Sequence, residues 1–436
     1  MKQTEEIKTE NSSEKDKTIL TVLIIVATFV AISSIAFAAI MFLGAKDADV
    51  ENVVEEAVTS TTETNLDISI SESPLPDTGQ AKCYGNTSSI TCPDEGDDFY
   101  GQDAQYTSNE MWYKDNGDGT VTDLITGLTW QQDSGDKVTY SEAAAGADAL
   151  TLVGYDDWRL PTIKELYSLM DFSGIDAGSY QGSDTSELTP FLNTDYFEFA
   201  YGDTSSGDRL IDSQWATSSV YESTVMNNSE CFFGVNFADG RIKCYPTSNK
   251  EYFVIYVRGD SYGINDFQDN GDGTVTDEAT SLMWQKTDSG EGMNWEESLD
   301  YCEALTLADH DDWRLPNAKE LQSIVDYSRS PDTTNSAAID SIFSVSSITN
   351  EEGEKDYPSY WTSTTHTRYP SSGDTAVYIS FGRALGYMNG EWMDVHGAGA
   401  QRSDPKTGDS SDFPTGRGPQ GDAIRIDNYV RCVRDV

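Results

Sequence analysis

The chain has 436 residues, which is enough for two hydrophobic cores and a tail, and 37% of them are hydrophobic. With 75 acidic against 28 basic residues, its formal net charge is −47. So negative a chain repels polyanions, which excludes nucleic acid from the expected partners. Most runs of like charge are solvated surface, so the acidity alone predicts solubility rather than a specific ligand.

The N-terminal part of the sequence predicts a membrane anchor. Four lysines lie in residues 1–18, and an apolar run without charge follows at 19–43, longer than the roughly 20 residues that a membrane-spanning helix needs. Because lysines gather before the run, we expect residues 1–18 in the cytoplasm and everything after the run outside, in a periplasm or at a cell surface. A signal peptide cleaved near Ala45 is the alternative, although its apolar core usually has only about 7 to 15 residues.

The segment at 44–80 is rich in Glu, Asp, Ser and Thr and nearly free of aromatic residues. Such a composition cannot bury enough apolar surface to offset the entropy of ordering, so it predicts a flexible acidic linker. Beyond it the sequence repeats itself, which predicts two domains, at 81–260 and 261–436.

Both repeats begin with the same run, Asn-Gly-Asp-Gly-Thr-Val-Thr-Asp, at 116–123 and again at 270–277. Asn-Gly and Asp-Gly between strand-like residues predict a β-hairpin, since these residues tolerate the positive φ of tight turns. A helix then follows in each repeat, because a capping residue stands three positions before a glutamate. These capping boxes are Thr139 with Glu142, and Asn294 with Glu297.

The run Trp-Arg-Leu-Pro at 158–161 and at 313–316 predicts a corner between a strand and a second helix. The helix is again opened by capping boxes, Thr162 with Glu165 and Asn317 with Glu320. Several strand-like runs complete each repeat, and the last of them is expected to return beside the first. Hairpin, two helices and several strands together predict an α+β fold with antiparallel sheet.

The six cysteines are expected to form disulfides outside the cytoplasm. Cys302 and Cys432 occur in the second repeat, while the matching positions of the first hold Ala147 and Tyr256, and such joint absence is typical of a bonded pair. The same comparison pairs Cys231 with Cys244, and Cys83 with Cys92 remains. A metal site is the alternative, but the sequence has no Cys-x-x-Cys and only three histidines.

The Cys231–Cys244 pair needs a particular connection between its strands. A tight turn at 239–240 would not place these two residues opposite each other, so a β-bulge or a longer loop is required.

Several motifs together resemble one known family. They are Pro-Asp-Thr-Gly-Gln-Ala-Lys-Cys at 76–83, Tyr-Gly-Gln-Asp-Ala-Gln-Tyr at 100–106, the repeated Asp-Gly-Thr-Val-Thr-Asp and Asp-Asp-Trp-Arg-Leu-Pro, and the closing Val-Arg-Cys-Val-Arg. In this order they resemble the C-terminal domain of the Legionella collagen-like adhesin, in two tandem copies over about 76–436. More distantly, Leu-Pro-Thr-x-x-Glu is similar to the formylglycine-generating enzymes, which have a C-type-lectin-like fold.

The resemblance implies two tandem C-type-lectin-like domains and surface attachment rather than catalysis. No collagen-like Gly-X-Y tract is present. An enzyme of the formylglycine-generating type would need a reactive cysteine pair, whereas Cys302 and Cys432 are interpreted as structural.

Two sets of candidate site residues follow from the sequence. The hairpin carboxylates could gather around Ca²⁺, although turn chemistry is the favoured interpretation; they are Asp115, Asp118, Asp123, Asp269, Asp272 and Asp277. The Gly- and aromatic-rich region at 366–417 could offer stacking faces and donors to a sugar or a protein; its candidates are Arg368, Tyr369, Arg383, Tyr387, Trp392 and Arg402. The recurring tryptophans are interpreted as core, and Arg159 and Arg314 as partners of carboxylates.

We therefore expect a membrane-anchored, non-catalytic adhesion protein that binds a glycan or surface partner, with oligomerisation left open. No cofactor is expected unless the hairpins hold calcium. The alternatives are an enzyme of the formylglycine-generating type and a structural envelope protein. The sequence has no nucleophile elbow, Gly-rich phosphate loop or metalloprotease pair.

Overall fold

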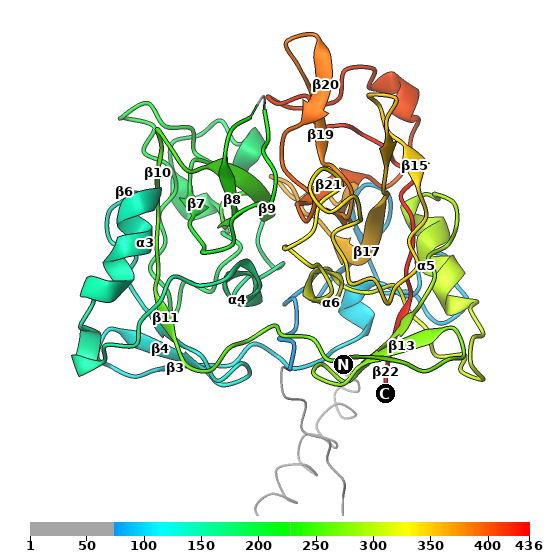
Figure 1. Ribbon diagram of the computed structural model, residues 1–436, viewed down its shortest axis with the longest axis horizontal. Helices are drawn as coiled ribbons and strands as arrows, with labels where there is room; N and C mark the ends of the chain where they lie inside the picture. Colours follow the sequence, from blue (N-terminus) through cyan, green and yellow to red (C-terminus); the bar gives the residue numbers. More distant parts are fainter. Residues whose placement is uncertain (1–73, 227) are drawn as a thin grey trace, which may run out of the picture. The chain divides into compact units, whose positions relative to one another are not determined.

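The computed structural model describes residues 74–226 and 228–436, which belong to one unit of the chain (Figure 1). The expected cytoplasmic segment, membrane helix and most of the acidic linker lie outside these residues. Within the described ranges, no helix is long and apolar enough to cross a membrane. These residues are mostly sheet with few helices, as an α+β chain requires.

The opening hairpin of each repeat extends into a four-stranded antiparallel sheet. The strands of the first repeat are β3 (Tyr113–Asp115), β4 (Thr120–Asp123), β5 (Thr129–Gln131) and β11 (Val257–Arg258), in the order β11-β5-β4-β3. Those of the second are β12 (Phe267–Asp269), β13 (Thr274–Asp277), β14 (Leu282–Gln285) and β22 (Val433–Asp435), in that order. The two sheets therefore have the same topology.

The last strand of each repeat closes this sheet, but its neighbour is the third strand and not the first. Val257 lies opposite Trp130, and Val433 opposite Trp284. The reason lies in the corner, because Val257 also forms a bridge with Arg159, as Val433 does with Arg314. The last strand is thereby held between the corner and the third strand.

All four predicted capping boxes form, with the capping side chain and the glutamate each accepting a backbone N–H. The helices that they open are α3 (Tyr140–Ala149) and α4 (Ile163–Ser168) in the first repeat, and α5 (Trp295–Glu303) and α6 (Ala318–Ser323) in the second. Short 3₁₀ turns lie at η1 (Asp103–Gln105), η2 (Leu152–Gly154), η3 (Ala177–Ser179), η4 (Thr185–Glu187) and η5 (Ser410–Asp412).

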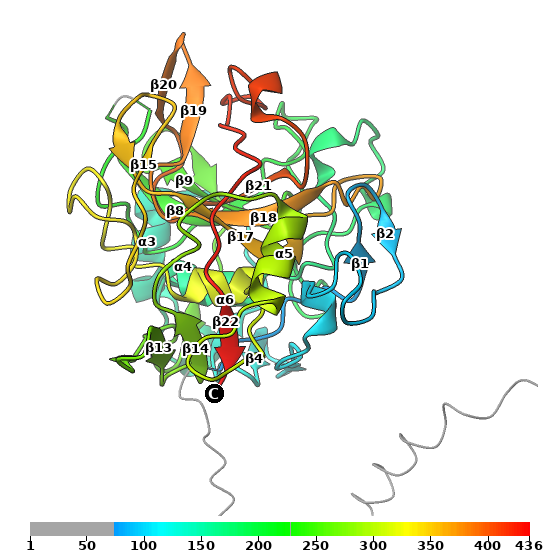
Figure 2. The same ribbon diagram turned by 90° about the vertical axis from the view of Figure 1, so that its right-hand side faces the viewer.

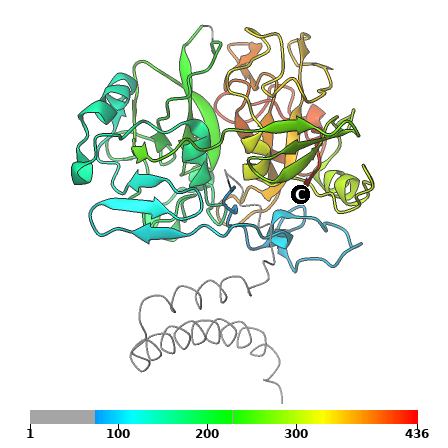
Figure 3. The same cartoon turned by 60° about the horizontal axis from the view of Figure 1, so that its bottom comes forward.

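A six-stranded sheet runs through both repeats. Its strands are, in order, β17 (Ser359–Thr365), β18 (Thr375–Ser380), β21 (Gln401–Pro405), β9 (Arg241–Pro246), β8 (Cys231–Asn236) and β7 (Gln214–Trp215). The repeats meet at its centre, where Gln401 lies opposite Ile242 in an antiparallel pair. Each repeat contributes three strands in mirrored order, so the halves are related by an approximate twofold axis, and they lie side by side in Figure 1 and Figure 3.

The remaining strands form small pairs. They are β1 (Cys83–Tyr84) with β2 (Ser89–Ile90), β6 (Val138–Thr139) with β10 (Glu251–Tyr252), β15 (Ile348–Thr349) with β16 (Lys355–Asp356), and β19 (Leu385–Met388) with β20 (Glu391–Asp394). The β19–β20 hairpin stands between β18 and β21, where the first repeat has only residues 237–240 between β8 and β9. This insertion is a difference between the two repeats, and it rises above the central sheet in Figure 2.

The segment that precedes the first hairpin packs against the second repeat. The Gln80 side chain exchanges hydrogen bonds with the backbone of Thr365, and the Tyr106 hydroxyl donates to Glu303 at 2.7 Å. Figure 2 shows β1 and β2 beside α5 and β18. Gln80 belongs to the expected flexible linker, but it is buried here, so the linker ends before this residue. Tyr106 belongs to the expected first domain, yet it contacts the second repeat.

One hydrophobic core continues across the boundary between the repeats. It includes Trp130 and Leu166 of the first and Trp284 and Leu321 of the second, each at most 1% exposed. The recurring tryptophans of the corners and strands are buried as well, namely Trp158, Trp215, Trp313 and Trp361. The corner arginines pair with carboxylates through two hydrogen bonds each, Arg159 with Glu165 and Arg314 with Glu320.

Candidate functional site

The hairpin aspartates are occupied by their own turns. Asp115 and Asp269 each accept the N–H two residues further on, and Asp118 and Asp272 accept both the N–H and the hydroxyl of the following threonine. Asp123 and Asp277 are buried and accept backbone N–H groups. Among the described residues, no three His, Cys, Asp or Glu side chains are placed to hold a metal. Each of these carboxylates is therefore engaged by neighbouring donors of its own repeat.

The six cysteines form the three disulfides expected from the sequence, Cys83–Cys92, Cys231–Cys244 and Cys302–Cys432. The second bond needs no bulge. Residues 237–240 form a longer connection than a two-residue turn, and Cys244 then lies opposite Phe233, diagonally across from Cys231. The Cα atoms of the two cysteines are 5.4 Å apart, within bonding reach. The described residues hold no free cysteine, so they offer no reactive thiol.

The six candidate ligand residues of 366–417 do not form one site. Arg383 is held by Asp332 and Asp356, and Tyr369 packs edge-on against Tyr180. Tyr387 and Trp392 are opposite each other on the β19–β20 hairpin. Arg368 and Arg402 line one pocket, and Trp392 lines another. Half of the set therefore faces a cavity.

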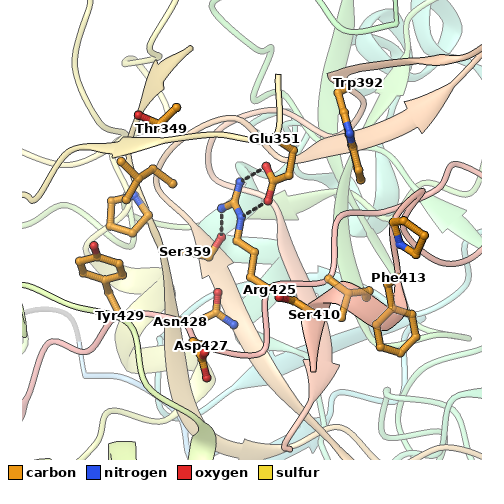
Figure 4. Close-up of a pocket in the computed structure, with 14 residues that line it drawn as sticks. Thr349, Glu351, Ser359, Trp392, Ser410, Phe413, Arg425, Asp427, Asn428 and Tyr429 are labelled. Atoms are coloured by element: carbon orange, nitrogen blue, oxygen red, sulfur yellow. Dashed lines mark hydrogen bonds and ion pairs between the residues drawn. The ribbon is translucent and has the colours of Figure 1, made fainter. Parts of the chain in front are cut away.

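The pocket that Trp392 lines, here called the aromatic pocket, belongs to the second repeat and has a volume of about 400 Å³. Three half-buried rings face it, those of Trp392, Phe413 and Tyr429. Between the rings of Trp392 and Tyr429 lies Arg425, which donates to Glu351 through two hydrogen bonds of 2.9 and 3.0 Å (Figure 4). The pocket combines apolar faces with fixed hydrogen-bonding groups.

Arg425 and Glu351 hold each other in place. Burial alone would raise the pKa of Glu351, but the ion pair with Arg425 lowers it below its usual value. Burial alone would lower the pKa of Arg425, but Glu351 and other neighbours raise it. Arg425 also donates to the Ser359 hydroxyl at 3.1 Å. Further polar groups at the pocket come from Thr349, Ser410, Asp427 and Asn428. Sequence reasoning missed these residues, because they come from four segments with no shared motif.

The second pocket, here called the junction pocket, lies where β9 of the first repeat meets β21 of the second. Its volume is about 450 Å³. Seven of the 28 basic residues of the chain line it, against two acidic ones, Asp239 and Asp422. The basic residues are Arg209, Arg241, Lys243 and Lys250 from the first repeat, and Arg368, Arg402 and Arg417 from the second. In a chain of net charge −47, this pocket is locally basic.

Two arginines meet across the boundary in this pocket. Since Gln401 lies opposite Ile242 in an antiparallel pair, the next residue along β21, Arg402, lies opposite Arg241. Burial, and then the charge of Arg241, lower the pKa of Arg402 to about 10. Arg402 pairs with Asp422, and Arg241 with Asp176 at 2.8 Å. Like charges directly opposite are unfavourable in a sheet, so these acids partly offset a repulsion built into the junction.

The fold and its pockets define a tandem-repeat, disulfide-stabilised α+β protein with one cavity inside a repeat and another between repeats. A family model described as the Lcl C-terminal domain matches residues 119–258 and 273–396. The chain therefore belongs to the Lcl C-terminal domain family, which it contains in two tandem copies. A search among curated proteins finds no match.

Proposed function

We propose that the protein is a non-catalytic, adhesin-like surface protein that binds a glycan through the aromatic pocket. Residues 19–43 would anchor it in a membrane, with its two repeats, of C-type-lectin-like fold, outside the cytoplasm. Membership in the Lcl C-terminal domain family supports the adhesin-like role. The disulfides and the lack of a free cysteine in the described ranges support an oxidising location and argue against formylglycine-type chemistry.

The observation that carries the glycan proposal is the composition of the aromatic pocket. A sugar ring presents apolar C–H faces and a rim of hydroxyl groups. The rings of Trp392, Phe413 and Tyr429 could pack on such faces, while the Arg425–Glu351 pair could exchange hydrogen bonds with the rim. A pocket of about 400 Å³ falls within the roughly 300–1,000 Å³ of small-ligand sites.

A glycan array probed with the full-length chain tests the proposal. We expect a defined set of glycans to bind, and Trp392→Ala to weaken that binding about tenfold through the loss of a stacking face. Trp112→Ala is the matched control, because Trp112 is 65% exposed and lines neither pocket. Binding that Trp392→Ala leaves unchanged would refute the site, and an array without any bound glycan would refute the function.

The structural envelope protein is the second candidate function, since the shared sheet and core could serve as a scaffold. Attachment of cells that carry the chain, compared with cells that lack it, separates the two. An adhesin raises attachment to glycan-coated surfaces, whereas a scaffold changes only the envelope.

A further inference from the structure

The junction pocket has the features of a built site for an anion. Its floor is formed by adjacent strands at the centre of the six-stranded sheet, so Arg241, Lys243 and Arg402 are fixed by a backbone that belongs to both repeats. Each of these side chains is about nine-tenths buried or slightly less. Rigid strands position charged groups more accurately than loops do.

Arg402 is incompletely partnered. Its Nη2 atom donates to Asp422, but Nε and Nη1 are buried and have no hydrogen-bond partner among the residues that the structure describes. Arg402 is only 8% exposed. A buried charged donor without a partner costs free energy. Because Nε and Nη1 lie on different edges of the guanidinium, an oxygen of an oxyanion would accept from one of them beside Asp422.

Two further cations line the pocket outside the central strands. Arg417 is exposed, and its side chain makes no ion pair with another described residue. Lys250 contacts Asp212 at 3.7 Å and lies over the Tyr245 ring, 6.0 Å from its centroid. Both groups line the same pocket as the buried arginines, and so the positive charge is not confined to the central strands.

The charge of the whole chain restricts what can enter. At physiological ionic strength, fields are screened over about 8 Å, so a small anion inside the pocket interacts mainly with the local cations. A long polyanion would also lie along the acidic surface outside it, where a chain of −47 repels it. The pocket volume of about 450 Å³ matches one small organic molecule.

We infer that the junction pocket binds one small organic oxyanion, a molecule of about monosaccharide size that carries a carboxylate, phosphate or sulfate group. The ligand contacts both repeats, with Arg402 and Arg241 below it and Arg417 at the rim. This site is separate from the aromatic pocket, and the inference does not depend on glycan binding there.

Calorimetric titration of the full-length chain with glucuronate, glucose 6-phosphate and glucose 6-sulfate tests the inference, with glucose as the neutral probe. We expect saturable binding of at least one anion at one site per chain, and none of glucose. The preferred probe identifies the oxyanion. Arg417→Ala should weaken binding about tenfold, the loss of one charged hydrogen bond, and Arg402→Gln should weaken it at least as much.

The variants separate a lost ligand contact from a lost fold. Arg417 is exposed, so Arg417→Ala should unfold at the wild-type temperature even if Arg402→Gln does not. Lys114→Ala, at an exposed position of β3, removes one positive charge outside the pocket and should leave binding unchanged, as should Trp392→Ala. The inference is overturned if no small anion binds, if only a sulfated polymer binds, or if Arg417→Ala and Lys114→Ala behave alike.

Discussion

Lys164 and Lys319 occupy the same position in the two repeats, and each donates a hydrogen bond to the helix end of the other repeat. The amino group of Lys164 in α4 lies 2.6 Å from the carbonyl oxygen of Ser323, the last residue of α6. That of Lys319 lies 2.8 Å from the carbonyl oxygen of Ser168, the last residue of α4. A cation at a helix C-terminus is favourable, so the exchange joins the repeats reciprocally.

The lysine pair predicts a pH dependence of stability. Burial lowers the pKa of both amino groups from 10.5 to about 8, so between pH 8 and 10.5 the unfolded chain binds more protons than the folded one. Stability contributed by these groups therefore rises with pH in that window and is lost as pH falls through 8. Near pH 10 the gain is on the order of 2 kcal/mol for each lysine.

Chemical unfolding of the wild type and of Lys164→Met/Lys319→Met at several pH values from 7 to 10 measures this effect. The difference in unfolding free energy between the two proteins should change with pH. Buried tyrosines with a raised pKa also titrate, but both proteins contain them, so their contribution cancels in this difference. A difference that stays constant from pH 7 to 10 would contradict the assignment.

The three disulfides should contribute unequally to stability. Cys302 and Cys432 are 130 residues apart in sequence, whereas Cys83 and Cys92 are 9 apart. The loop-entropy relation gives about 5 kcal/mol for the longer loop and about 2.5 kcal/mol for the shorter one. Cys302→Ala/Cys432→Ala should therefore lower the thermal midpoint more than Cys83→Ala/Cys92→Ala, and the reverse order would show that contacts, not loop length, decide the effect.

The two corner pairs should matter to a similar extent. Their carboxylates are both buried, since Glu320 is 5% and Glu165 only 1% exposed, although the partner arginines Arg314 and Arg159 are 8% and 34% exposed. Removing the arginine leaves a buried, uncompensated carboxylate and costs about 3–5 kcal/mol. Arg314→Met and Arg159→Met should therefore each destabilise the protein by that order, as measured by denaturant unfolding. A negligible loss in Arg159→Met would show that Glu165 does not depend on its arginine.

Removal of divalent cations tests the calcium alternative for the hairpins. Because each aspartate is already engaged by its turn, we expect the same thermal midpoint with and without a calcium chelator. A lower midpoint with the chelator, restored by added Ca²⁺ and abolished by Asp118→Asn/Asp272→Asn, would instead establish a metal site.

Local features of the fold could be predicted, because neighbouring residues determine them. The capping boxes, such as Thr162 with Glu165, and the Asn-Gly hairpins each depend on a few adjacent side chains. Comparison of the repeats was enough to pair Cys302 with Cys432. The capping boxes and hairpins needed only the chain within one repeat, whereas the disulfide needed the second copy for comparison.

Contacts between distant segments could not be predicted in the same way. Nothing in the residues of β9 or β21 specifies that these edges pair, since backbone hydrogen bonds carry no sequence information. For that reason the junction pocket was missed, although Arg368 and Arg402 were candidates individually. The ion pairs of Arg383 could likewise not be predicted from the sequence, because Asp332 and Asp356 come from other segments of the chain.

The antiparallel contact of Gln401 with Ile242 makes the two halves self-complementary. A relative with a single copy would leave the outer backbone groups of the strand equivalent to β9 without a partner, and an exposed edge invites pairing with another chain. Two such molecules could complete the sheet as a homodimer. The same basic residues of both molecules would then meet at its twofold axis. Tandem duplication fuses that dimer into one chain, and it frees each side of the axis to diverge.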